Sequence, residues 1–293
     1  MISNPFSFCA PSLRRMRLLL ALAPTACLIA SGPVLAQQPS TPPPTPVPNA
    51  AQDTTVYDIH RTFKVGDVDR YRLVNKMLVN SPETGGNFVN VDMQLTVKQL
   101  TKSAKPDGTA VLTTTFENAT AVYNDQPIDL MTFLSNANVT MTLNKFGKVS
   151  DSKSDGVQGP LANANIDQMI AQATSGLYPD TPVKIGDSWK FETSRNMQGM
   201  TIKVAGTSTL VGIETIDGIK TFKIKTVIDN ADKNQVNTVF HAESTSNLDA
   251  QTGKVVRIAG KVNYDVDTTK AKGNITATRL TEKAATTTPA PKP

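Results

Sequence analysis

Hydrophobic and polar residues alternate along most of the chain between residues 54 and 280. The clearest run is 89–98, where apolar residues at odd positions are separated by polar ones. Successive side chains of a strand point to opposite faces, so this pattern predicts strands with one buried and one solvated face. Similar runs lie at 139–143, 221–228 and 256–266.

Short segments that contain glycine separate the predicted strands and indicate tight turns. They lie at 106–108, 217–218, 252–253 and 272–274. Glycine readily adopts the positive φ that such turns need. The expected strands lie near 89–101, 110–116, 201–215, 219–229, 236–249, 254–267 and 275–280. Short links make neighbours antiparallel, so the second half is expected to form a meander.

One segment, 161–174, has a helical rather than a strand period. Ile166, Met169, Ile170 and Ala173 recur at helical spacing within it. Proline suits the first turn of a helix, and Pro160 precedes the segment. A helix is therefore predicted there, and a weaker helical turn is expected within 128–134.

A short motif occurs twice in the chain. Residues 63–67 read Phe-Lys-Val-Gly-Asp, and 183–187 read Val-Lys-Ile-Gly-Asp. Two interpretations are open. The motif is a turn before the first strand of each copy, with glycine and aspartate supplying turn chemistry. Alternatively, Lys64 with Asp67, and Lys184 with Asp187, form two equivalent ligand sites.

These patterns together predict a mainly β fold. We expect one large curved antiparallel sheet or half-barrel, with one helix packed on its concave side and two similar halves. The internal repeat lies near 60–120 and 180–230, within a single β-rich domain at 54–280. The apolar faces of the strands provide the partner that the helix needs.

The first 36 residues resemble a cleavable secretory signal. Arg14, Arg15 and Arg17 form a basic start, an apolar stretch follows, and the small residue Ala36 precedes the expected cleavage. A proline-rich linker is expected at 37–53 and a disordered tail at 281–293. The signal predicts a location in the periplasm or outside the cell.

A lipoprotein anchor and an uncleaved membrane-spanning helix are the alternatives to a cleaved signal in this region. Cys27 is a candidate for the acylated cysteine of a lipoprotein, but Pro24 and the apolar residues after Cys27 disfavour it. Residues 31–33, Ser-Gly-Pro, interrupt the apolar run before it reaches the roughly 20 residues of a membrane-spanning helix. No transmembrane segment is expected in the mature chain.

The balance of charges and the cysteine content both differ once the signal is removed. The full chain has 30 basic and 25 acidic residues, and loss of the three signal arginines leaves 27 against 25. No basic run is interleaved with aromatic residues, so a nucleic-acid partner is not expected. Cys9 and Cys27 both lie in the signal, so the mature chain is expected to have no disulfide or thiolate chemistry.

No motif for catalysis, metals or cofactors stands out. His60 and His241 are the only histidines, and neither belongs to a metal-ligand spacing. No Gly-x-Ser-x-Gly elbow or phosphate-binding glycine loop is present. The 25 acidic residues leave a carboxylate-dependent hydrolase open. No catalytic, metal or cofactor-binding residue is therefore predicted.

Two motifs are similar to those of a known group of proteins: the repeated Lys-x-Gly-Asp start, and residues 249–257, which read Asp-Ala-Gln-Thr-Gly-Lys-Val-Val-Arg. They resemble bacterial secreted β-rich proteins with a domain of unknown function. The expected architecture, a curved sheet around a helix, also resembles periplasmic lipoprotein carriers of the LolA/LppX type. That second resemblance implies a lipid partner by analogy of architecture alone.

The function that this sequence favours is an exported, non-enzymatic envelope protein that binds an apolar ligand or lipid between sheet and helix. Met93, Met141, Met169 and Ile170 are the candidate cavity residues, because methionine adapts to varied apolar shapes. The same four residues also suit an ordinary filled core. A structural or adhesion domain without a pocket and a carboxylate-dependent hydrolase are the alternatives.

Overall fold

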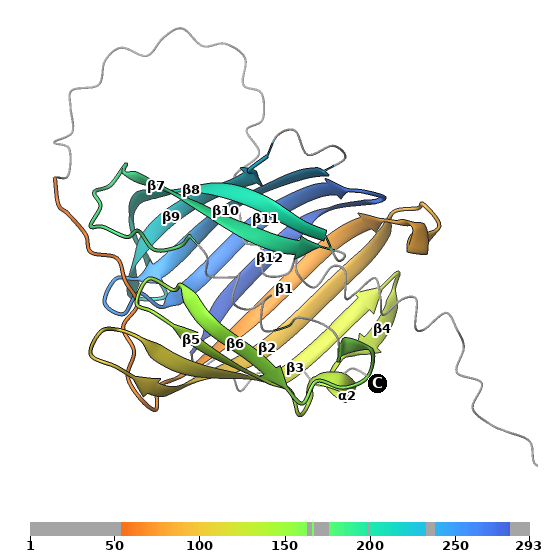
Figure 1. Ribbon diagram of the computed structural model, residues 1–293, viewed down its shortest axis with the longest axis horizontal. Helices are drawn as coiled ribbons and strands as arrows, with labels where there is room; N and C mark the ends of the chain where they lie inside the picture. The colour runs from red at the N-terminus through yellow and green to blue at the C-terminus, as the bar shows by residue number, and fades with distance from the viewer. Residues whose placement is uncertain (1–53, 163–165, 167–175, 198–199, 233–237, 282–293) are drawn as a thin grey trace, which may run out of the picture.

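The computed structural model describes residues 54–162, 166, 176–197, 200–232 and 238–281. Within them the chain forms twelve strands (Figure 1). They are β1 (Val68–Asn80), β2 (Val89–Ala104), β3 (Ala110–Tyr123), β4 (Gln126–Asp129), β5 (Asn138–Leu143), β6 (Val149–Asp155), β7 (Ser188–Met197), β8 (Met200–Ile216), β9 (Ile219–Asn230), β10 (Thr238–Asp249), β11 (Val255–Val266) and β12 (Thr269–Leu280).

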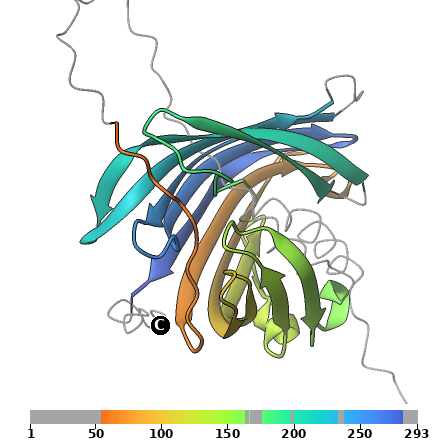
Figure 2. The same ribbon diagram turned by 60° about the vertical axis from the view of Figure 1, so that its left-hand side comes forward.

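All twelve strands belong to one antiparallel sheet, as the alternating pattern predicted. The order is β6-β5-β3-β2-β1-β12-β11-β10-β9-β8-β7, and β4 pairs with β3 beside this path. The sheet is open, with β6 and β7 at its edges. Figures 1 and 2 show that the sheet curves strongly, so that both edge regions bend toward the same side of it.

The sheet consists of two meanders joined at a central seam. β1, β2, β3, β5 and β6 follow one another outward in one half, and β12 back to β7 in the other. At the seam β1 pairs with β12, from Arg70 opposite Leu280 to Asn80 opposite Lys270. The expected two halves and the expected meander are both confirmed.

The two copies of the repeated motif form the same turn. In the first, the N–H of Gly66 donates to the carbonyl of Thr101 (2.9 Å). In the second, the N–H of Gly186 donates to the carbonyl of Leu210 (2.7 Å). Both glycines have positive φ, 88° and 96°. Each turn therefore ties the start of a strand to the next strand of its own half.

The two faces of the sheet differ in burial. In β11, Val256, Ile258, Gly260, Val262 and Tyr264 are buried, while the residues between them are exposed or part-exposed. Nearly all the buried apolar residues of the long strands join one hydrophobic cluster that includes both halves. A curved sheet can share one core between its halves only on its concave side. We call that side the inner face and the opposite side the outer face.

One predicted turn is wrong. Residues 272–274 lie inside β12, which begins at Thr269, six residues before the expected strand start. The real turn uses Asp267, with φ 54°. Gly273 faces the neighbouring strand so closely that a Cβ would collide with the carbonyl of Lys76 and the side chain of Met77. Here glycine serves close packing between strands rather than a turn.

The helical predictions have mixed outcomes. The segment 161–174 lies mostly outside the described residues; within it, Ile166 is helical and buried. The weaker turn appears as the four-residue helix α2 (Met131–Leu134), whereas Ile128 belongs to β4. Two single 3-10 turns, η1 (Pro82–Thr84) and η2 (Gly159–Leu161), are the other elements of the described residues. Among the described residues no helix is long and apolar enough to cross a membrane.

Candidate functional site

Residues 54–63, which we call the strap, cross one end of the inner face before β1 begins. Tyr57 pairs with Val183, which precedes the edge strand β7. The N–H of Arg61 donates to Lys145 in the β5–β6 turn (2.8 Å), and that of Thr62 to Thr252 in the β10–β11 turn (2.9 Å). Ile59 is buried in the core between these contacts. The strap therefore fastens together distant parts of both halves.

Gly253, in the β10–β11 turn, makes the close contact of the strap possible. Its φ is 64°, and a Cβ would collide with the carbonyl of His60 and approach the Cα of Arg61. The Gly253 carbonyl accepts a hydrogen bond from the buried hydroxyl of Tyr178 (2.7 Å). Glycine is thus required by both backbone conformation and space.

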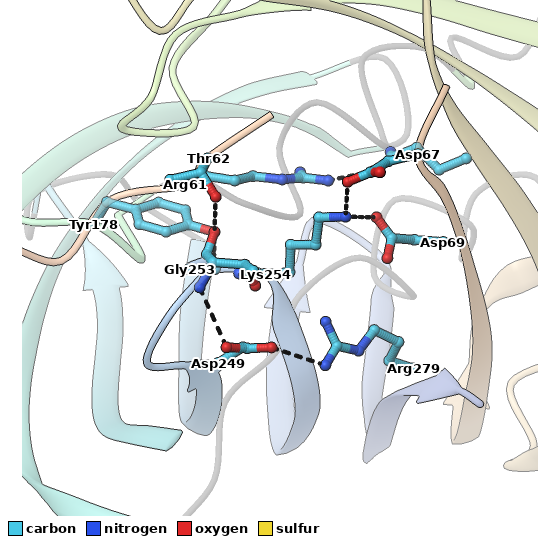
Figure 3. A network of polar contacts seen from close by, with 11 residues as sticks. Arg61, Thr62, Asp67, Asp69, Tyr178, Asp249, Gly253, Lys254 and Arg279 are labelled. Atoms are coloured by element: carbon cyan, nitrogen blue, oxygen red, sulfur yellow. Dashed lines mark hydrogen bonds and ion pairs between the residues drawn. The ribbon is translucent and has the colours of Figure 1, made fainter. Parts of the chain in front are cut away.

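A buried ionic network lies beside the strap at the seam (Figure 3). The ammonium of Lys254 is 2.9 Å from a carboxylate oxygen of Asp67 and 2.9 Å from one of Asp69. Arg279, on β12, pairs with Asp249 at the end of β10 (3.1 Å). The two motifs that carry the family resemblance therefore meet here, because Asp67 comes from the first and Asp249 and Lys254 from the second.

The geometry gives the repeated motif different roles in its two copies. Asp187 accepts a hydrogen bond from the N–H of its own turn residue Lys184 (2.8 Å). Asp67 instead binds Lys254, which lies 187 residues further along the chain (2.9 Å). The two aspartates are therefore equivalent in the turn but not in their side-chain partners.

Asp249 caps the β10–β11 turn. Its carboxylate accepts hydrogen bonds from the N–H groups of Gln251 (2.9 Å) and Thr252 (3.2 Å). Burial acts to raise the pKa of Asp249, but these hydrogen bonds and the contact with Arg279 outweigh burial and hold the pKa below its usual value. The carboxylate is thus kept ionised as part of the network.

Arg61 reaches from the strap onto the inner face and is only 7% exposed. Its guanidinium donates to the side-chain carbonyl of Gln99 (2.6 Å) and lies 5.0 Å from the ring centroid of Phe63. Its Nε is buried and has no hydrogen-bond partner. In the described part of the chain, Arg61 forms no ion pair with a carboxylate. This is an unusual state for a buried charge.

An apolar row crosses the inner face next to this cluster. Leu73 on β1 lies opposite Leu95 on β2, and opposite Ala277 on β12. Leu73 and Leu95 are part-exposed although they lie at the centre of the sheet, whereas Ala277 and Ala119, which continue the row, are buried. The inner face is therefore partly open at this leucine pair.

The predicted cavity residues have separate outcomes. Met93 on β2 and Met141 on β5 are buried members of the inner-face core. Met169 and Ile170 lie outside the described residues. A role for these four residues in lining a ligand cavity stays a prediction.

A groove of about 880 Å³ lies on the outer face, across strands β1, β2 and β10–β12. Its lining includes three lysines, Lys76, Lys261 and Lys272, and three acidic residues, Asp92, Asp125 and Glu243. The charges balance, so the groove favours neither a cation nor an anion. His241 also lines it; its ring nitrogen hydrogen-bonds to the carboxylate of Asp229, and this contact, only partly offset by burial, raises the pKa of His241.

The histidine and acidic side chains of the described residues are the candidates for a catalytic or metal centre. No group of three or more His, Cys, Asp or Glu side chains could hold a metal ion there. The pKa values of Asp107, Glu214 and Asp249 are lowered, in Glu214 chiefly by the hydrogen bond from Lys223. A lowered pKa suits a structural anion rather than a general acid.

Sequence reasoning missed Arg61, Lys254 and Arg279. The second motif was recognised as a turn, but its lysine was not assigned a partner. The one signal in the sequence that Lys254 has a structural role is its position, as a charged residue, within the motif at 249–257. Nothing in the local sequence marks Arg61 as buried.

No protein-family model matches this chain, and no curated protein matches it. A structure described as "lipid-protein interactions in lipovitellin" is similar over 78% of this chain, with 11% identity and a TM-score of 0.47. This chain covers 26% of that lipovitellin chain. DynF of the dynemicin biosynthesis pathway of Micromonospora chersina is similar over 82% of this chain and 95% of its own, with 11% identity and a TM-score of 0.22.

A third solved structure comes from work on the asymmetric conductivity of engineered proteins. It is similar over 73% of this chain and 99% of its own, with 7% identity and a TM-score of 0.21. Because all three TM-scores are below 0.5, these likenesses carry no argument about function.

Proposed function

We propose that this protein is an exported, non-enzymatic envelope protein that holds an apolar ligand, such as a lipid acyl chain, on the inner face of its sheet. The observation that carries the proposal is the part-exposed pair Leu73 and Leu95 at the centre of a largely buried apolar face. An acyl chain lying there removes apolar surface from water, which stabilises the complex by about 25 cal/mol for each Å² buried.

The surroundings of the leucine pair favour binding over catalysis. The row that contains it continues through Ala277 and Ile258 on the second half, both buried and apolar. Met93 lies two residues from Leu95 on the same face, where it can adapt to varied chain shapes. A surface of this kind recognises shape and hydrophobicity and offers no acid–base pair.

The export component rests on the sequence. Residues 1–36 have the basic, apolar and small-residue parts of a secretory signal, and the two cysteines lie within them. The remaining chain needs no disulfide for its fold, since one core joins both halves of the sheet. A periplasmic or secreted binding protein fits these features.

The test is native mass spectrometry of the full chain, expressed in a bacterium and released gently from the envelope. We expect a species heavier than the processed chain by the mass of a lipid, and lipid in an organic extract. An unliganded mass, together with no binding of a fluorescent fatty-acid probe, would favour a structural domain without a pocket and overturn the proposal.

A pair of neighbouring variants tests the position of the ligand. Leu73→Asn places a polar group on the inner face, whereas Val74→Asn makes the same kind of change on the outer face. We expect Leu73→Asn to weaken probe binding by roughly tenfold, since burying one leucine contributes about 1.5–3 kcal/mol. Equal binding by the two folded variants would place the ligand elsewhere.

A further inference from the structure

We propose that Arg61 binds the anionic headgroup of an amphipathic ligand whose apolar chain lies over Leu73 and Leu95. This inference rests on the proposed function and specifies the ligand class. The shared chemistry is one carboxylate or phosphate group on a single apolar chain. Three features of the site support this ligand: the unpaired charge of Arg61, its position on the inner face, and the hydroxyl donor beside it.

Arg61 is the one cation of this cluster that lacks a carboxylate within the described part of the chain. Lys254 binds Asp67 and Asp69, and Arg279 binds Asp249, so the nearby acidic groups already have cationic partners. Arg61 donates instead to the neutral amide of Gln99 (2.6 Å), and its buried Nε has no partner. A buried guanidinium in this state is stabilised strongly by an incoming anion.

The contacts of Arg61 place its charge at one end of the apolar row. Gln99, which accepts from Arg61, lies opposite Asp69 on β1. Tyr71 with Val97, and then Leu73 with Leu95, follow along the same face of the same two strands. Four residues along a strand span roughly 13 Å, so a headgroup at Gln99 and a chain reaching Leu95 fit one long amphiphile.

The groups between these points suit such a ligand. Burial raises the pKa of Tyr71, so its hydroxyl stays protonated and can donate to an anion. A planar guanidinium matches carboxylate and phosphate oxygens in pairs, which selects them over an alcohol.

The experiment compares ligands with the same chain and different headgroups on the full-length protein at pH 8. Dodecanoate, dodecyl phosphate and dodecanol are titrated against a bound fluorescent fatty-acid probe, with inorganic phosphate as the headgroup alone. We expect one or both anionic amphiphiles to bind at least roughly tenfold more tightly than dodecanol. Whichever anion is preferred identifies a fatty-acid or a phospholipid source.

Variants then locate the preference. Arg61→Gln should abolish the preference, so that dodecanoate and dodecyl phosphate bind no more tightly than dodecanol, while Arg61→Lys should keep part of it. Arg72→Gln is the matched control, because Arg72 is exposed on the outer face beside Tyr71. Circular dichroism and thermal unfolding establish that each variant is folded.

Each failure has its own meaning. Equal binding of dodecanoate, dodecyl phosphate and dodecanol to the unmodified protein overturns the headgroup proposal and leaves apolar binding intact, and this comparison needs no variant. An anion preference that survives in folded Arg61→Gln also overturns it. Absence of binding by all the chain-bearing ligands overturns the proposed function itself.

Discussion

Replacing Gly253 by alanine should release the strap from the sheet. The new Cβ would collide with backbone atoms of His60 and Arg61, which cannot move unless the strap moves. The φ of 64° adds about 1 kcal/mol for a residue with a side chain. The free-energy cost of the collision cannot exceed the cost of detaching the strap, because a detached strap no longer collides with the new Cβ.

The contacts of the strap set that upper limit. The part of the strap beside Gly253 makes two backbone hydrogen bonds, from Arg61 to Lys145 and from Thr62 to Thr252, which stabilise by about 1 kcal/mol each. Burial of Ile59, which is 1% exposed, adds about 2 kcal/mol. Gly253→Ala should therefore lower the free energy of unfolding by about 3–5 kcal/mol.

Gly218→Ala is the matched control. Gly218 has φ 81° in the β8–β9 turn, and no atom lies within 4 Å of its Cβ position, so this change carries the conformational cost alone. Urea unfolding gives both values, and hydrogen exchange at the Arg61 and Thr62 amides reports the strap directly. A Gly253→Ala protein as stable as Gly218→Ala, with both amides still protected, would refute the reasoning.

Two further changes test the ionic network. Lys254→Met leaves Asp67 and Asp69 without their cation and should lower the free energy of unfolding by about 3–5 kcal/mol. Lys270→Met, which removes the exposed pair with Asp265, should cost less than about 1 kcal/mol; similar urea midpoints would contradict this. The lowered pKa of Asp249 stabilises the fold above the unfolded pKa of about 4, and that stability is lost as pH falls through the folded pKa. Between about pH 6 and about pH 3, the urea midpoint of Asp249→Asn should therefore fall less steeply than that of the unmodified protein. Parallel curves would argue against a stabilising role of the Asp249 carboxylate.

The strands could be predicted because their signal is local. Alternation at 89–98 and 256–266 located β2 and β11 to within a few residues at their starts. The turn at 217–218 was predicted for the right reason, since Gly218 has positive φ. Gly273 was misread because the same residue type serves turns and close approaches between strands, and only the position of β1 distinguishes them.

The candidate site could not be predicted because its contacts are distant in sequence. Thr62 and Thr252, which join the strap to the β10–β11 turn, are 190 residues apart. The strap itself has no periodic pattern, and an arginine before a turn is usually solvated. Burial of Arg61 follows only from the curvature that brings both halves of the sheet around it.

The pairing of β1 with β12 sets an order of events during folding. β1 is among the first strands to be synthesised, yet one of its edges stays uncovered until β12, the last strand, is available. Contacts between such distant segments form slowly, and an uncovered strand edge can pair with other chains. A nascent chain is therefore vulnerable to misassembly until β12 is available to pair with β1.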